Sequence, residues 1–161
     1  MKYESKTNRL INILQKKNIK LCAAESITGG RFAFEIIKNE GASKIFSYSL
    51  VTYTSESKSK ILGLKKEINK TNVVSREISK YMAREVIRFS NPRKTLAISC
   101  TGQAGPKILN INFPIGTVFI GVAYKEKIFS FKRCFDLKDR NSIINSTVKE
   151  MVSICLKIVE S

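Results

Sequence analysis

Apolar residues recur along the chain with two different periods, and the longer period predicts helices. Residues 5–17 carry apolar positions three and four apart, which is the spacing of one helix face. The same spacing predicts helices after Thr28, over 55–62, over 75–90 and over 140–159. We therefore expect five helices, spread over the whole chain.

Short runs of apolar or β-branched residues separate these helices and predict five strands. Residues 19–24 and 95–100 are almost continuously apolar, as buried strands are. Residues 47–54, SYSLVTYT, are rich in β-branched and aromatic side chains, which favour strands. Residues 116–124 and 128–135 are joined by a short polar connection, so they predict an antiparallel hairpin.

The order of these elements predicts the fold class. Two helix–strand pairs are followed by two helices, three strands and a last helix, which is the order of an α/β protein. We expect a three-layer α/β/α sandwich in which helices cover both faces of a mixed sheet. With 161 residues, 43% of them apolar, residues 1–161 are expected to form a single domain.

The composition restricts the chemistry, because the chain contains no histidine. Ser-His-Asp triads, Cys-His pairs and imidazole-based metal sites are therefore excluded. The four cysteines lie far apart within apolar segments, with no CxxC pair, so we expect all four to be buried; they are Cys22, Cys100, Cys134 and Cys155.

A net charge of +16 raises the question of nucleic-acid binding. The basic residues are scattered over nearly every segment, with no basic arm and no stacked aromatic motif, so no specific nucleic-acid partner is expected. The N-terminus lacks the apolar core of a signal peptide, and no apolar run is long enough to span a bilayer. We expect a cytoplasmic protein that does not associate with membranes.

Two loops are placed where an α/β sheet binds ligands, beyond the carboxyl ends of strands. They are residues 25–30, which follow the first predicted strand, and residues 101–106, which follow the third. Small residues in these loops allow backbone N–H groups to approach a ligand, and Thr28 is placed to cap the following helix. The simpler alternative is that the glycines only make turns.

Ser26 and Lys58 are the candidates for chemistry. A nucleophilic Ser26 would need a base other than histidine. Lys58 falls in the first turn of a predicted helix, where the helix dipole disfavours a positive charge, so its pKa would be lowered if it were desolvated. The alternative is an ordinary solvated lysine on a basic surface.

Several segments, in this order and spacing, resemble one known family. They are AAESITGG, GASKIFSYSLVTYTSESKSKILGL, VSREISKYMAREV, TGQAGP with FPIGTVFIGVA after it, and DR before the last helix. Over nearly its whole length the chain resembles the C-terminal domain of the competence/damage-inducible protein family CinA, a family of nicotinamide mononucleotide amidohydrolases. The resemblance implies deamidation of nicotinamide mononucleotide to nicotinate mononucleotide and ammonia. It also implies that Ser26 is the nucleophile, with Lys58 and Tyr53 handling its proton and no metal or cofactor.

The resemblance further implies a set of substrate-binding residues. Backbone N–H groups near Thr28, Gly29 and Gly30 are expected to hold either the oxyanion or the phosphate. Thr101, Gly102 and Gly105 are expected to line the opposite side of the site. The full set is Glu25, Thr28, Gly29, Gly30, Thr101, Gly102, Gly105 and Arg140. Family precedent and an apolar hairpin also lead us to expect a homodimer.

The chain departs from the family pattern at three positions. Ile108 and Leu109 stand where the family usually has a Gly-Gly pair, and Ile144 stands where it usually has an arginine. These departures leave open whether activity is retained. The alternative functions are a degenerate homologue that binds a nucleotide or protein without turnover and, with less support, a basic nucleic-acid-binding protein.

Overall fold

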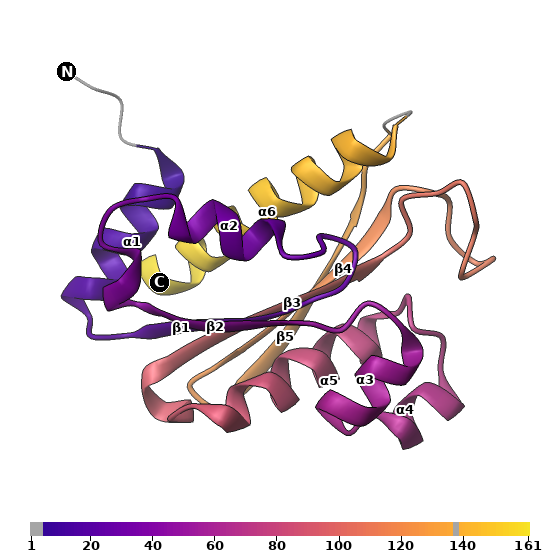
Figure 1. Cartoon of the computed structure of the whole chain (residues 1–161), viewed down its shortest axis with the longest axis horizontal. Helices are drawn as coiled ribbons and strands as arrows, with labels where there is room; N and C mark the ends of the chain where they lie inside the picture. The colour runs from indigo at the N-terminus through magenta and orange to yellow at the C-terminus, as the bar shows by residue number, and fades with distance from the viewer. Residues whose placement is uncertain (1–4, 137–138) are drawn as a thin grey trace.

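One five-stranded sheet organises the computed structural model, which describes residues 5–136 and 139–161 (Figure 1). Its strand order is β2-β1-β3-β4-β5. The strands are β1 (Lys20–Glu25), β2 (Phe46–Val51), β3 (Thr95–Gly102), β4 (Thr117–Tyr124) and β5 (Lys127–Cys134). β1 pairs in parallel with β2 and β3, whereas the β3–β4 and β4–β5 pairs are antiparallel. The predicted mixed sheet is confirmed.

Helices cover both faces of the sheet, so the predicted three-layer sandwich is also confirmed (Figure 1). One face carries α1 (Lys6–Lys16), α2 (Arg31–Ile37) and α6 (Arg140–Glu160). The other carries α3 (Ser55–Leu62), α4 (Lys65–Lys70) and α5 (Arg76–Val86). Short 3₁₀ turns lie at Ala42–Lys44, Ile87–Phe89 and Pro92–Lys94.

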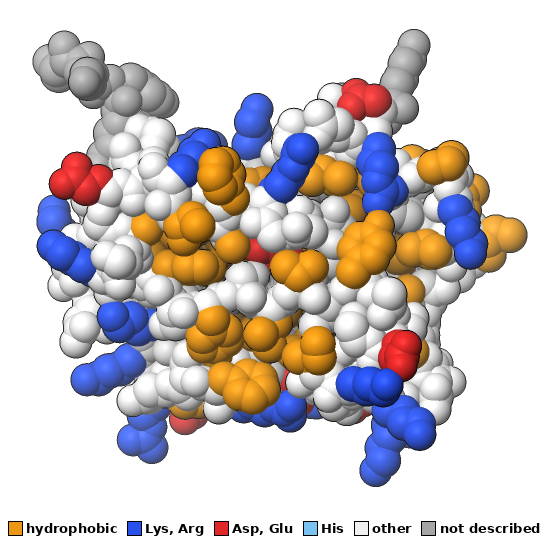
Figure 2. Space-filling model, in the orientation of Figure 1, with side chains coloured by type: hydrophobic (Ala, Val, Ile, Leu, Met, Phe, Trp, Pro, Cys, Tyr) orange, Lys and Arg blue, Asp and Glu red, His pale blue; other side chains and the backbone are white. Residues whose placement is uncertain are grey.

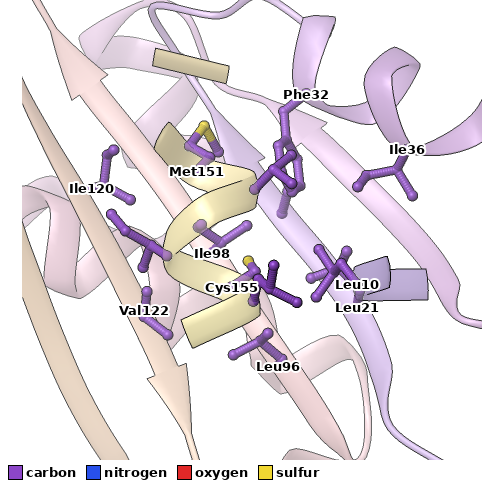
Figure 3. Close-up of a cluster of buried hydrophobic side chains, with 14 of the residues drawn as sticks. Leu10, Leu21, Phe32, Ile36, Leu96, Ile98, Ile120, Val122, Met151 and Cys155 are labelled. Carbon is purple, nitrogen blue, oxygen red and sulfur yellow. The ribbon is translucent and has the colours of Figure 1, made fainter. Parts of the chain in front are cut away.

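The larger hydrophobic core lies between the sheet and the layer of α1, α2 and α6 (Figure 3). It includes Leu10, Leu21, Phe32, Ile36, Leu96, Ile98, Ile120, Val122, Met151 and Cys155. Each large apolar side chain buried in this way contributes about 1.5–3 kcal/mol to folding. This core fixes the sheet against α2, the helix that follows the candidate nucleophile.

The opposite layer packs more closely on the sheet. A Cβ atom placed on Gly121 in β4 would lie 2.0 Å from the carbonyl oxygen of Ser79 in α5, so only glycine permits this contact. A second core under α5 contains Leu62, Leu64, Ile78 and Met82. Since Leu62 ends α3 and Leu64 directly precedes α4, this core also holds the segment that carries Lys58.

Two sequence predictions need correction, and one helix was not predicted. Thr28 does not cap α2, because the N-cap residue is Gly30, which has no side chain that could accept a capping hydrogen bond. The helix α4 was not predicted; it spans only six residues and buries none of them. Cys134 is exposed, since it ends β5 at the edge of the sheet, whereas the other three cysteines are buried.

Within residues 5–136 and 139–161, none of the helices combines the length and apolar character needed to cross a bilayer.

Candidate active site

Ser26 lies at the carboxyl end of β1, and the parallel strand β2 ends beside it. Parallel neighbours bring their carboxyl ends to the same edge of a sheet, so the loops after β1 and β2 meet there. Ser26 is 7% exposed and opens a tight turn in which the Gly29 amide donates to its carbonyl oxygen at 3.1 Å. The second loop runs from Thr52 into α3.

The start of α3 is fixed by a capping box, and this determines where Lys58 lies. The hydroxyl of Thr54 accepts from the Ser57 amide, and the hydroxyl of Ser57 accepts from the Thr54 amide, each at 3.0 Å. Side chains on a helix lean toward its N-terminus, so Lys58 in the first turn reaches back toward the loops.

Lys58 is buried, with 2% of its surface exposed, and its amine contacts Ser26. Its Nζ donates to the Ser26 Oγ at 2.8 Å, to the Thr52 carbonyl oxygen at 2.7 Å and to the Tyr53 carbonyl oxygen at 3.3 Å. Burial lowers the pKa of Lys58 to about 8, because the charged form loses its water shell. The alternative of a solvated surface lysine is wrong.

The Glu25 side chain stabilises the start of α2 and does not face the pocket. The residue is fully buried, and its carboxylate accepts from the amides of Phe32 and Ala33, each at 3.0 Å, at the start of α2. It also accepts from the hydroxyls of Thr28 and Ser49 at 2.7 and 2.8 Å. A carboxylate at a helix N-terminus satisfies N–H groups that would otherwise lack partners. The predicted contact of Glu25 with substrate is therefore replaced by an internal clamp.

The same clamp corrects the predicted roles of Thr28, Gly29 and Gly30. The Gly30 amide donates to Glu25 at 3.0 Å, and the Gly29 amide donates to Ser26 within the turn. Thr28 is buried; its hydroxyl donates to Glu25 and its backbone N–H donates to the Cys100 sulfur. These groups hold the turn in shape, so they do not present donors to an oxyanion or a phosphate.

Cys100 lies behind the nucleophile turn, a position that sequence reasoning did not identify. Its sulfur is 3.1 Å from the Thr28 hydroxyl and accepts hydrogen bonds from the backbones of Ser26 and Thr28. Burial raises the pKa of the Cys100 thiol to about 11, which keeps the thiol neutral at physiological pH. Cys100 therefore supports the turn as a weakly polar packing group.

A pocket of about 340 Å³ opens in front of Ser26 and Lys58. Thr101, Gly102 and Gly105 line it, as the sequence predicted. Its lining residues are Ser26, Ile27, Tyr53, Thr54, Ser55, Lys58, Val73, Val74, Thr101, Gly102, Gln103, Ala104, Gly105, Pro106, Lys107, Leu109 and Arg140. Among these described residues there are three cations and no carboxylate, so the pocket is suited to an anionic ligand.

Arg140 and Tyr53 form a contact across the mouth of this pocket. The guanidinium of Arg140 donates to the Tyr53 hydroxyl and to the Gly105 carbonyl oxygen, each at 2.7 Å. The phenol of Tyr53 is 56% exposed, and its hydroxyl pairs with Arg140 rather than with Ser26 or Lys58. The arrangement thus differs from the predicted proton relay, since only the backbone of Tyr53 contacts Lys58.

Two of the three departures from the family pattern lie at or near the pocket. Leu109 lines the pocket, and Ile108 lies beside it, half exposed. Ile144 instead packs partly buried against the larger core, on α6. Sequence reasoning missed Lys107, which brings a cation to the pocket from the same loop as Leu109.

A family model supports the assignment made from sequence. The model of the CinA C-terminal domain matches residues 3–159. The chain belongs to this family. A CinA-like protein from Flavobacterium psychrophilum is 35% identical over 146 residues, and one from Petrotoga mobilis is 38% identical over 135. These matches cover 90% and 83% of this chain but only 34% and 33% of the relatives, so the chain spans about a third of their length.

The fold of CinA-family structures agrees with that of this chain. A competence-damaged protein (CinA) superfamily protein from Escherichia coli superposes with a TM-score of 0.88 at 25% identity. The superposition covers 95% of this chain and 88% of the other. In the described part of this chain, no group of three or more Cys, Asp or Glu side chains is arranged to hold a metal ion.

Proposed function

We propose that this CinA-family domain is a serine amidohydrolase that deamidates nicotinamide mononucleotide to nicotinate mononucleotide and ammonia. The observation that carries the proposal is the buried Lys58 amine 2.8 Å from the Ser26 hydroxyl. A lysine with a pKa lowered to about 8 is partly neutral at physiological pH, and the neutral amine can accept the serine proton. This pairing activates a serine without histidine.

The reaction follows from this pair. Lys58 takes the proton of Ser26 as the Oγ attacks the carboxamide carbon, and it returns the proton to the departing nitrogen, which leaves as ammonia. The product of this first step is a nicotinoyl ester on Ser26. Lys58 then takes a proton from water as the water attacks the ester, and the protonated Lys58 restores the Ser26 hydroxyl.

The pocket supports an anionic, drug-sized substrate. Its volume of about 340 Å³ lies at the lower end of the range for small-molecule sites. Arg140 and Lys107 lie in its wall, where their charges would attract the phosphate of a mononucleotide. The apolar wall that includes Val74 and Leu109 would contact the pyridine ring.

Ammonia release tests the proposal. Purified protein is incubated with nicotinamide mononucleotide and a metal chelator, beside the Ser26→Ala and Lys58→Met variants. Lys60→Met is the matched control, because Lys60 lies on the same helix but pairs with Glu56 at the surface. We expect release by the parent and by Lys60→Met, and a loss of about 10³-fold or more in the other two. Equal release by Ser26→Ala would remove the serine from the mechanism.

A second function is favoured by Leu109, whose bulky side chain lines the pocket where the family usually has glycine. A homologue altered in this way would bind a nucleotide without turnover. Measurable binding of nicotinamide mononucleotide with no ammonia release from a folded parent would establish this alternative.

Charge gives little support to nucleic-acid binding, since Lys and Arg side chains are spread over the face in Figure 2 rather than gathered in one patch.

The expected homodimer remains a prediction. Ile128 and Phe129 at the start of β5 are each 39% exposed, so the hairpin offers apolar surface for such a contact.

A further inference from the structure

The long loop between β3 and β4, residues 103–116, forms one wall of the pocket and projects beyond the sheet (Figure 1). It contains Ile108 and Leu109, the bulky residues that stand in place of the family's usual Gly-Gly pair. A loop of this length without helix or strand needs internal contacts to keep one shape. The hydrogen bonds of a single side chain, Gln103, supply many of them.

Gln103 is 1% exposed, and its carboxamide bonds to both arms of the loop. Its Oε1 accepts from the amides of Leu109 at 3.0 Å and Asn110 at 2.9 Å. Its Nε2 donates to the carbonyl oxygens of Phe113 at 2.6 Å and Pro114 at 3.1 Å. One amide group therefore ties residues 109–110 to residues 113–114.

The backbone of Gln103 joins this clasp to the sheet. Its amide donates to the Thr117 carbonyl oxygen at 3.0 Å, and its carbonyl oxygen accepts from the Gly116 amide at 2.8 Å. The two ends of the loop are thus held together at the point where β4 begins. The backbone of Gln103 is therefore fixed, and its side chain reaches the loop from a defined position.

A second set of bonds fixes the loop against the opposite wall of the pocket. The Asn110 side chain donates to the Val74 carbonyl oxygen, and the Asn72 side chain donates to the Leu109 carbonyl oxygen, each at 2.8 Å. Val74 and Leu109 both line the pocket. The clasped loop therefore sets the distance between two pocket walls.

The loop also carries the acceptor that holds Arg140, since the Gly105 carbonyl oxygen takes one of the two Arg140 bonds. We propose that Gln103 is the positioning residue of this pocket: its buried carboxamide holds the loop so that Leu109 and Arg140 face the substrate. On this basis Gln103 governs substrate binding, whereas Ser26 and Lys58 carry the chemistry. The kinetic part of the proposal rests on the amidase function proposed above.

Only a side-chain amide can make these contacts. It combines an acceptor for two N–H groups with an NH₂ that donates to carbonyl oxygens. Gln103→Met keeps the length of the side chain but leaves the loop groups without partners, which costs about 1–3 kcal/mol for each buried group. Gln103→Glu keeps the acceptor for the two N–H groups but replaces the NH₂ donor with a carboxylate oxygen that faces the carbonyl oxygens of Phe113 and Pro114.

Amide hydrogen exchange measured by NMR tests the clasp without any substrate. We expect Gln103→Met to speed exchange at Leu109 and Asn110 by about tenfold or more, and to leave Ile120 in β4 unchanged. Gln15→Met is the matched control, because it removes one side-chain bond, to Gly41, far from the pocket. Unchanged exchange at Leu109 and Asn110 would overturn the proposal.

Kinetics test the consequence for binding. For nicotinamide mononucleotide we expect Gln103→Met to raise KM by about tenfold and to leave kcat within about threefold of the parent. A small fluorophosphonate, which needs only a reactive Ser26, should label both proteins at equal rates. Slower labelling with KM unchanged would place Gln103 in the chemistry and overturn the proposal.

The exchange and labelling experiments distinguish a failure of this proposal from a failure of the proposed function. A parent that releases no ammonia contradicts the amidase function, while the exchange and labelling results still decide the role of Gln103. If Gln103→Met does not fold, Gln103→Glu takes its place. In that variant a carboxylate oxygen faces the carbonyl oxygens of Phe113 and Pro114 and repels that arm of the loop. We therefore expect faster exchange of the Phe113 amide, which donates to the Asn110 carbonyl oxygen at 3.2 Å, with the Leu109 amide still protected. Equal protection of the Phe113 amide would overturn the proposal.

Discussion

The Lys58 amine donates to the Ser26 hydroxyl at 2.8 Å, although the two residues are 32 positions apart and belong to opposite sides of the sheet. Ser26 leads into α2 in one helical layer, and Lys58 lies in α3 in the other. The contact is made only where the loops after β1 and β2 meet. Burial at this point removes water from the Lys58 amine, so the packing of the two loops lowers its pKa.

The rate of ammonia release should rise with pH and then level off. Only the neutral Lys58 can take the serine proton, and burial lowers its pKa to about 8. Below this pKa we expect kcat/KM to increase about tenfold per pH unit, and above it to reach a plateau. The measurement is kcat/KM for nicotinamide mononucleotide across this range. A profile that does not change with pH would be incompatible with Lys58 as the base.

The free energy of unfolding should also depend on pH through Lys58, and it should rise as the pH rises. The pKa of Lys58 is lowered from 10.5 to about 8, so between these values the unfolded chain binds a proton that the folded chain has released. The unfolding free energy of the parent should therefore rise with pH in this window relative to Lys58→Met. At 1.36 kcal/mol per pKa unit the relative gain is about 3 kcal/mol.

Urea unfolding of the parent and Lys58→Met at several pH values from neutral to alkaline measures this difference. Lys60→Met serves as the control, because its side chain is exposed and pairs with Glu56 at the surface. A difference between parent and Lys58→Met that stays constant with pH would show that Lys58 is not desolvated.

Tyr53→Phe distinguishes an anchoring hydroxyl from a proton relay. The Tyr53 hydroxyl accepts from Arg140, so its loss should disturb substrate binding rather than proton transfer. We expect kcat within about threefold of the parent and a KM raised by a few-fold. Tyr81→Phe, on α5, is the control. A fall in kcat of about a hundredfold would instead assign the proton to Tyr53.

Glu25→Gln should destabilise the domain. The variant replaces one carboxylate oxygen with an NH₂ group, which faces N–H donors at the start of α2. We expect the unfolding free energy to fall by about 3 kcal/mol, the scale for losing hydrogen bonds to a buried charge. Chemical denaturation measures it. The exposed Glu77→Gln should remain within about 0.5 kcal/mol of the parent, and a similar result for Glu25→Gln would disprove the clamp.

Periodicity was sufficient to predict most elements of the fold, because long apolar faces leave clear patterns. The predicted helix over 55–62 agrees with α3 at both ends, since Thr54 caps it and Gly63 ends it in a left-handed conformation. The helix α4 escaped prediction because its six residues bury no side chain. The start of α2 was misplaced because its cap comes from Glu25, a residue of the preceding strand.

The site was predictable only in part, and the reason is spatial. Ser26 and Lys58 could be named because the resemblance to the CinA family implies their roles, and the absence of histidine is consistent with a lysine as the base. Glu25 and Thr28 were expected to bind substrate, because no local pattern shows that the Glu25 carboxylate and the Thr28 hydroxyl face each other in the interior. The contacts of Gln103 span up to 11 residues and depend on the folded path of the loop.

The position of the reacting pair between two helical layers has a consequence for the chain before it is fully folded. Until α3 has docked on one face and the turn before α2 has formed on the other, Lys58 is hydrated and fully protonated, and Ser26 is an ordinary alcohol. In a partly unfolded chain the pair of Ser26 and Lys58 is therefore absent, and Lys58 keeps the ordinary pKa of a solvated lysine. On the proposed mechanism, the reactivity of Ser26 therefore depends on the completed tertiary structure.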